Sequence, residues 1–145
     1  MKSRILLLSC ILAIALGSCT VKLIANYDNN IASQVESALK MVDKFYLTML
    51  ETSKNEEKAR AYTIFVQDYI GIEIELQSLL DKNRVRPLNK NSTAIAENTL
   101  KQFQKYKEQH KADNYLSDAN IILNRMYMHD QLVLLQMGES FKPRE

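Results

Sequence analysis

The chain has little of what β-rich, disulfide-bonded and nucleic-acid-binding proteins depend on. Its 145 residues include three Gly, two Pro, two Cys and no Trp. Few Gly and Pro leave few tight turns, which disfavours a β protein, and abundant Leu, Lys, Glu and Ala favour helices. A formal charge of +2 provides no strongly basic face for nucleic acid, and a 46% hydrophobic share excludes wholesale disorder. The length suits one domain.

The first 18 residues have the layout of a leader. Lys2 and Arg4 precede an apolar run of twelve residues, Ile5 to Leu16. As a helix this run spans only ~18 Å, well short of the ~30 Å hydrocarbon core of a bilayer. The sequence therefore predicts a signal peptide over residues 1–18 rather than a membrane-spanning helix.

The apolar run ends in Leu16-Gly17-Ser18-Cys19, which resembles the lipobox of bacterial lipoproteins. The resemblance implies cleavage between Ser18 and Cys19, a diacylglycerol on the Cys19 sulfur and a palmitate-like acyl chain on its amino group. The alternative is an ordinary secretory signal in which Cys19 is incidental. Because Thr20 rather than Asp follows, resemblance to enterobacterial lipoproteins further implies sorting to the outer membrane, facing the periplasm.

Removal of the leader changes both the charge and the cysteine count. The processed chain runs for 127 residues from Cys19 to Glu145, with 17 basic and 17 acidic residues and a single Cys. No disulfide can form within it, so its stability depends on core packing. Acylated Cys19 is expected to be a nearly permanent membrane anchor, because each buried CH₂ adds ~0.8 kcal/mol.

A short tether is predicted between the lipidated Cys and the folded body, over residues 19–28. Leu23, Ile24 and Tyr27 are expected to pack on the body, and the alternative is a place at the lipid interface. The stretch Leu23–Asp28, leading into a long helix, also resembles small helical-bundle lipoproteins of Gram-negative bacteria. That likeness implies no known activity.

The bundle is predicted over residues 29–138, and its first two helices show strong periodicity. After an N-cap at Asp28, with either following Asn as an alternative, apolar residues recur every three or four positions to an end near Thr52. The second helix is predicted from a capping box at Ser53–Glu56 to an end between residues 81 and 86. Its core residues follow a heptad spacing: Tyr62, Phe65, Tyr69, Ile72, Leu76 and Leu79.

Two further helices follow a predicted loop at Leu88–Asn91. The third is capped by Asn91 or Ser92 and ends at a turn at Asp113-Asn114. The fourth is capped by Ser117 or Asn114 and stops before Gly138, so that 139–145 form a tail. Its core face is predicted to comprise Ala119, Ile122, Leu123, Met126, Tyr127, Val133, Leu134 and Met137. Short loops make neighbours antiparallel, which predicts an all-α, up-down-up-down four-helix bundle.

The second and third helices carry opposite charge. Residues 56–81 hold six acids and two bases, whereas residues 82–111 hold eight bases and two acids. Salt bridges between neighbouring helices and solvated surface are the expected outcome. The alternative is a basic strip for anionic lipid or an acidic partner, for which the candidate residues are Lys101, Lys105, Lys107 and Lys111.

The chain offers few groups for catalysis or metal binding. It lacks Glu-x-x-His, His-Glu-x-x-His and Cys-x-x-Cys-His motifs, a Gly-rich phosphate loop and a Gly-x-Ser-x-Gly elbow. We therefore predict no catalytic residue and no cofactor beyond the lipid on Cys19. Met126, Met128 and His129 are soft groups of the kind that bind copper, although core filling and a surface His are the expected roles.

These patterns predict a non-enzymatic, lipid-anchored protein that presents a helical bundle to a protein partner or structure of the cell envelope, with no nucleic-acid partner. The alternative is an envelope module that binds a small ligand or a metal, centred on residues 126–129. A hydrolase of cell-wall polymer, or its inhibitor, ranks third, because the acids are expected to face solvent rather than converge in a cleft.

Overall fold

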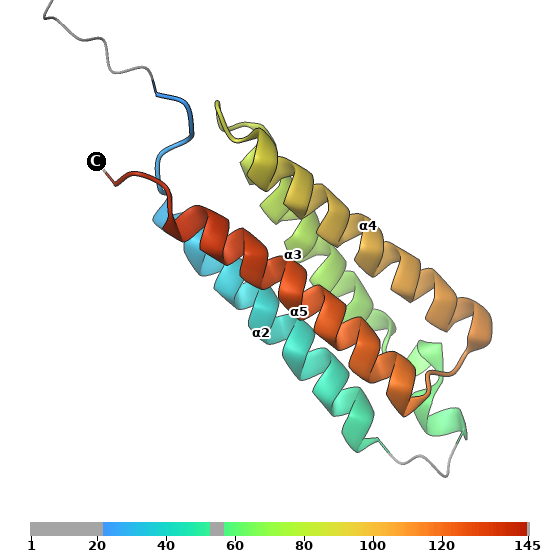
Figure 1. Cartoon of the computed structure of the whole chain (residues 1–145). Coiled ribbons are helices and arrows are strands. Elements are labelled where there is room, and N and C mark those ends of the chain that lie inside the picture. The colour runs from blue at the N-terminus through green and yellow to red at the C-terminus, as the bar shows by residue number, and fades with distance from the viewer. Residues whose placement is uncertain (1–21, 53–56, 145) are drawn as a thin grey trace, which may run out of the picture.

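The computed structural model describes residues 22–52 and 57–144, and its long elements are all helices. They are α2 (Asn29–Glu51), α3 (Val66–Arg84), α4 (Lys90–Asp113) and α5 (Asp118–Ser140), with two short 3₁₀ helices, η1 (Glu57–Arg60) and η2 (Tyr62–Ile64), before α3. Each long helix packs antiparallel to the next, and α5 returns to α2 (Figure 1). The predicted all-α, up-down-up-down bundle is confirmed. In the described ranges, no helix is long and apolar enough to cross a bilayer.

The core follows the periodicity of α2 and α3. All buried residues of α2 belong to its predicted stripe: Ile31, Val35, Ala38, Val42, Phe45, Tyr46 and Met49. On α3 the heptad residues from Phe65 onward are buried. The Phe45 ring meets Phe65 and Tyr69 edge-on, with ring centroids 6.0 and 4.8 Å away. Such edge-to-face pairs add ~0.5–1.5 kcal/mol each beyond the area that they bury.

Capping side chains fix several helix ends as predicted. An Asp28 carboxylate oxygen accepts hydrogen bonds from the backbone N–H groups of Asn30 and Ile31, at 2.8 and 3.3 Å. Ser117 Oγ accepts a hydrogen bond from the backbone N–H of Asn120, in the first turn of α5, at 3.3 Å. Asn114 ends α4 in the left-handed conformation, with φ 50°. Asn tolerates this conformation better than most residues do, which explains the turn there.

The predicted second helix starts later than expected. Its capping box, Ser53–Glu56, lies outside the described residues. From Glu57 to Phe65 the chain forms two 3₁₀ turns, separated by an extended Ala61 with φ −65° and ψ 141°. The cause is tertiary, because the buried Arg60 side chain binds Asp118 at the start of α5 and the Tyr62 N–H binds Asn114, the C-cap of α4. Tyr62 is consequently only partly buried at the edge of the core.

The start of α4 also differs from the prediction. Asn91 and Ser92 lie within its first turn rather than at its cap. Leu88 adopts a left-handed φ of 58°, which turns the chain abruptly into the helix. The side-chain amide of Asn89 donates to the two oxygens of Asn83, at 2.8 and 3.1 Å, and holds this turn against the end of α3.

The end of α5 lies beyond its predicted stop. Gly138, predicted as the first residue after the helix, is inside α5, which continues to Ser140, so the tail begins at Phe141. Glu139 accounts for the additional residues. Its buried carboxylate accepts a hydrogen bond from the Asp28 N–H at 2.7 Å and pairs with Arg86, which favours helix through this position.

Of the three residues predicted to pack in the N-terminal segment, only Tyr27 is partly buried, with Arg144 over its ring at 4.5 Å. Leu23 and Ile24 are exposed, and Ala25 is the buried residue. The Ala25 N–H donates to the Leu88 carbonyl at 3.1 Å, and the Tyr27 N–H donates to a carbonyl of the C-terminal tail at 2.8 Å. Residues 22–28 thus run between the α3–α4 loop and the tail, with their two largest aliphatic side chains outside.

Candidate functional site

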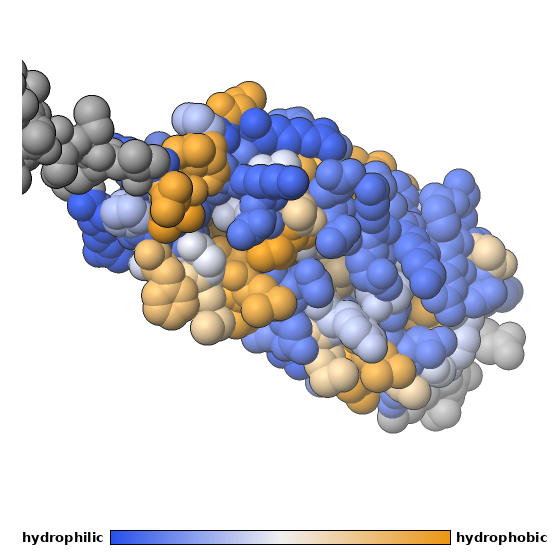
Figure 2. Space-filling model, turned by 45° about the horizontal axis from the view of Figure 1, so that its top comes forward, coloured by the Kyte–Doolittle hydropathy of each residue, from blue (hydrophilic) through white to orange (hydrophobic). Residues whose placement is uncertain are grey.

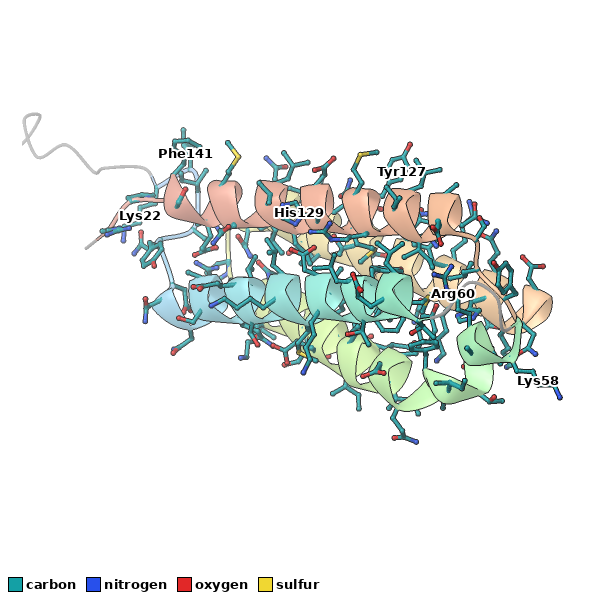
Figure 3. All side chains as sticks on the ribbon, turned by 90° about the horizontal axis from the view of Figure 1, so that it is seen from below. Lys22, Lys58, Arg60, Tyr127, His129 and Phe141 are labelled. Atoms are coloured by element: carbon teal, nitrogen blue, oxygen red, sulfur yellow. The ribbon has the colours of Figure 1, made fainter. Side chains whose placement is uncertain are left out.

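The outward side of α5 is the largest run of exposed apolar residues on any helix of the described structure. We call it the α5 outer face, and its side chains are 46–54% exposed: Ile122, Leu123, Met126, Tyr127, Leu134 and Met137. Tyr127 points away from the other helices in Figure 3, on the same side of α5 as Phe141. Exposed apolar residues grouped on one helix face, rather than scattered, are typical of an interaction surface.

The α5 outer face corrects the predicted core face of this helix. Most of the residues predicted to be buried are exposed, Ala119 among them, and Val133 is half-buried. The side facing the bundle instead carries Ile121, Asn124, Met128, Leu132, Leu135 and Glu139. α5 is apolar on both sides, and the polar Asn124 and Glu139 interrupt the inner set. The 3,4,4,3,4 spacing of that set is the signal that could have identified it.

One charged side chain lies at the centre of the α5 outer face. Helical geometry places Asp130 close to midway in angle between Ile122 and Tyr127, and along the helix between Tyr127 and Leu134. Its carboxylate is exposed and makes no ion pair within the described part of the chain. The face therefore offers apolar contacts around a single negative charge.

The predicted metal candidates do not converge. Met128 is fully buried in the core, whereas Met126 is half-exposed on the opposite side of α5. His129 lies between α5 and α2 (Figure 3), and its Nδ1 is 3.2 Å from Asp43. Arg125 Nε is 2.9 Å from the other oxygen of the same carboxylate. In the described ranges no three His, Cys, Asp or Glu side chains are grouped to hold a metal.

The four candidate lysines of α4 do not form one free strip. Lys107 Nζ is 2.6 Å from Glu73 of α3. Lys101 and Lys111 pair with acids of their own helix, at 2.7 and 3.9 Å. Lys105 lines a groove between α4 and α5, beside Tyr106 and Tyr127. The opposite charges of α3 and α4 thus meet in part across their interface, as the first interpretation of the charge pattern expects.

A buried arginine joins the segments at the end of the bundle opposite the termini. Arg60 has no exposed surface, and its Nη1 is 2.6 Å from an Asp118 carboxylate oxygen. The guanidinium also donates to the carbonyls of Leu50, Thr52 and Leu116, at 3.0–3.4 Å. Charge-assisted bonds of this kind are strong, and here they connect the end of α2, η1 and the start of α5. No local sequence pattern indicates this role for Arg60.

A buried histidine lies beside this arginine. His110 Nε2 donates to the Arg60 carbonyl at 2.8 Å, so Nδ1 accepts from the Tyr69 hydroxyl at 3.0 Å. Burial lowers the pKa of His110 below its ordinary value, although the bond to the carbonyl opposes that shift. Burial also raises the pKa of Tyr69. His110 has no exposed surface, and its two hydrogen bonds connect α4 to η1 and α3.

A second buried ionic cluster lies where the chain enters and leaves the bundle. Glu139, 1% exposed, is 2.5 Å from Lys142 Nζ and 3.0 Å from Arg86 Nη1. Lys142 Nζ also donates to Asn89 Oδ1 at 2.6 Å, and Arg86 to the Asn26 carbonyl. Sequence reasoning missed this cluster, because its members come from three distant segments with no common spacing.

The pKa shifts in this cluster follow from burial and pairing. Burial alone raises the pKa of Glu139, but hydrogen bonds from Arg86, Lys142 and the Asp28 N–H outweigh it, and the net shift is downward. Burial lowers the pKa of Lys142, against the effect of its bond to Glu139. The three charges therefore depend on one another, which favours a structural role in holding this end of the molecule together.

Comparison with protein-family models, with curated proteins and with solved structures finds no match. The function is therefore inferred from the geometry of this chain. The exposed apolar surface along α5 suits binding, whereas the buried polar clusters suit stability.

Proposed function

We propose that the chain is a lipid-anchored protein of the bacterial envelope with a non-enzymatic role, in which the α5 outer face binds a helix of a protein partner. The observation that carries the proposal is the six half-exposed apolar side chains on one face of a helix that is already packed on its other side. A single copy of the chain does not bury this second apolar stripe in its own core. A helix–helix interface, in contrast, requires an apolar stripe on each partner.

The dimensions and charge of the face indicate its occupant. From Ile122 to Met137 the face runs for about four helical turns, or ~22 Å, which matches the length of an ordinary amphipathic helix. Asp130 at its centre is complementary to a Lys or Arg among the apolar residues of that partner helix. The face itself carries no lysine or arginine, so an anionic lipid surface fits it poorly.

The proposed location rests on the lipobox-like Leu16-Gly17-Ser18-Cys19 and on the neighbouring Thr20. We infer that lipid on Cys19 holds the bundle at the outer membrane, on the periplasmic side. Labelling cells with radioactive palmitate tests the anchor directly. Label on the chain that disappears in a Cys19→Ser variant supports it, and label that persists in the variant contradicts it.

Site-specific photocrosslinking in intact cells tests the partner. A photoreactive amino acid at Met126 or Leu134 lies on the α5 outer face, and one at Ile74, exposed on α3, is the matched control. We expect a discrete product from the first two positions only, with the crosslinked peptide of the partner in an amphipathic basic helix. A product with a second copy of this chain, or equal products from all three positions, contradicts the proposed occupant.

A further inference from the structure

We propose that the end of the bundle that carries the termini docks on a surface of anionic phospholipid. This end, which we call the tether end, is formed by residues 22–28, 81–90 and 139–144, brought together from three parts of the chain (Figure 1). The proposal goes beyond the α5 partner and does not depend on it. It uses the proposed lipid anchor only to say on which side of the protein the bilayer lies. It can therefore be tested with protein that carries no lipid.

The tether end has a strongly exposed apolar tip. Its large side chains are 49–82% exposed: Leu23, Ile24, Val85, Leu88 and Phe141. Figure 2 shows hydrophobic side chains gathered at the left-hand end of the bundle, with hydrophilic ones around them. A groove of about 440 Å³ between Leu23, Leu88 and Phe141 adds recessed apolar surface. Exposure of such side chains to water does not stabilise the fold, whereas the interface of a bilayer buries them.

The same end is strongly basic. Outside the buried cluster of Arg86, Lys142 and Glu139, its three segments hold five bases and two acids: Lys22, Lys82, Arg84, Lys90 and Arg144 against Asp28 and Asp81. At the opposite end, residues 51–52, 58–60 and 108–118 hold three bases and four acids. Among the described residues, the tether end is thus positive and the opposite end is nearly neutral. Only the positive end is complementary to anionic headgroups, which attract each nearby base by about 1 kcal/mol, a factor of about five in affinity.

The apolar tip is held in place rather than left as loose ends. Backbone hydrogen bonds join Ala25 to Leu88 and Tyr27 to Pro143, at 3.1 and 2.8 Å. The buried Glu139 pairs with cations of both the α3–α4 loop and the tail. The three segments therefore present their side chains as one surface, and little conformational entropy is lost when that surface meets a bilayer.

Leu88 supplies an independent observation at the tip. It has a left-handed φ of 58°, a conformation in which Gly or Asn is far less strained than Leu. Its side chain is 55% exposed, so core packing does not compensate for that strain. Backbone strain retained by an exposed apolar residue is typical of a binding surface rather than of a simple turn.

The position of the preceding chain favours lipid over a protein as the occupant. Cys19 stands three residues before Lys22, and an extended segment of that length reaches only ~11 Å. If Cys19 is acylated, the apolar tip lies at the bilayer surface whatever else the protein binds. The helices then extend away from the membrane, and the α5 outer face, ~22 Å long, is accessible to soluble or envelope partners.

Vesicle binding tests the proposal with a fluorescent reporter that the chain lacks. We use residues 19–145 with Cys19→Ser, which keeps every described residue and cannot be acylated. Since the chain has no Trp, Phe141→Trp gives a single emitter at the tip, and Ile64→Trp gives one at the opposite end. With phosphatidylglycerol vesicles we expect a blue shift and quenching by brominated lipid for Trp at position 141 only. Pure phosphatidylcholine vesicles should bind far more weakly.

Three substitutions separate charge, apolar contact and fold. Lys90→Gln should weaken binding to the anionic vesicles about fivefold, whereas Lys58→Gln at the opposite end leaves it unchanged. With Trp at position 141 as the reporter, replacing the exposed Leu23 by Gln should weaken it about tenfold. Leu88→Asn suits the left-handed backbone, so it should keep or raise the thermal midpoint of unfolding while still weakening vesicle binding several-fold.

Absence of binding to phosphatidylglycerol vesicles overturns the proposal. Equal binding to both kinds of vesicle overturns the role of charge, as does equal weakening by Lys90→Gln and Lys58→Gln. A Leu88→Asn variant that binds like the parent shows that the tip is not the contact. None of these results bears on the α5 crosslinking experiment, so failure of one proposal is distinguishable from failure of the other.

Discussion

Glu139 is the residue whose loss should most disturb the tether end. It is 1% exposed, and the two cations that it neutralises, Arg86 and Lys142, have side chains only 13% and 7% exposed. Glu139→Gln preserves the shape of the side chain and an oxygen for the Asp28 N–H, but leaves two buried positive charges without a counter-charge. Breaking a buried pair in this way costs ~3–5 kcal/mol of the free energy of unfolding.

Chemical and thermal unfolding of the purified chain measure this loss. We expect a fall of ~3 kcal/mol, at the low end because Arg86 keeps some access to water, and a midpoint lower by about 10 °C. The exposed Glu36, which pairs with Lys40 at 2.5 Å, is the matched control, and Glu36→Gln should leave the midpoint unchanged. A change of less than ~1 kcal/mol at Glu139 contradicts the reasoning.

The dependence on pH gives the same test a second readout. Because the pKa of Glu139 is lowered in the folded state, its contribution is fully present above the unfolded pKa of ~4.3 and is lost as the pH falls through the folded pKa. The difference between wild type and Glu139→Gln should therefore shrink in acid. A difference that stays constant down to the lowest pH at which the chain folds would show that ionisation of Glu139 is not the cause.

Three further outcomes follow from the described contacts. Leu135→Ala, on the inner side of α5, should cost ~2–5 kcal/mol in urea unfolding, whereas the adjacent Leu134→Ala should stay within ~0.5 kcal/mol. Arg60→Met should cost ~3 kcal/mol in the same assay, since it removes the ion pair with Asp118 and the donor to the carbonyls of Leu50, Thr52 and Leu116. The lowered pKa of His110 means that its neutral form stabilises the fold fully above pH ~6.5, and that stability falls as the pH drops below that value. The free energy of unfolding of His110→Gln should not show this dependence on pH.

Each of these outcomes has a result that contradicts it. Equal costs at Leu134 and Leu135 would show that both sides of α5 are core. An Arg60→Met variant as stable as Lys58→Met, its exposed neighbour in η1, would remove the structural role of the buried guanidinium. For His110, the same fall in stability between pH 7 and 5 in wild type and variant would assign the titration to another group.

Sequence patterns predicted the parts of the fold that are governed locally. The α2 stripe and its Asp28 cap, the heptad from Phe65 to Leu79 and the turn at Asn114 all follow from spacing and side-chain chemistry within a few residues. In each of these helices one face is clearly more apolar than the other, so the pattern identifies which face is buried.

The errors fall where distant segments decide the structure. α5 has two apolar sides, and only the neighbouring helices determine which one is buried. The 3₁₀ turns around Arg60 depend on carbonyls from α2 and on Asp118, which no local pattern reveals. Leu23 and Ile24 were expected to pack, but the Ala25 and Tyr27 backbone bonds turn them outward. The candidate surfaces therefore became visible only with the tertiary structure.

The most direct test of the proposed role is the yield of the Met126 photocrosslink in cells that express the chain with and without Leu134→Ser. The two residues share the α5 outer face but lie two turns apart, and both are half-exposed. A partner helix that covers the face requires a crosslink yield at least several-fold lower in the variant, with the unfolding midpoint of the purified chain unchanged. An unchanged yield would contradict the account, because the face would then not act as one binding surface.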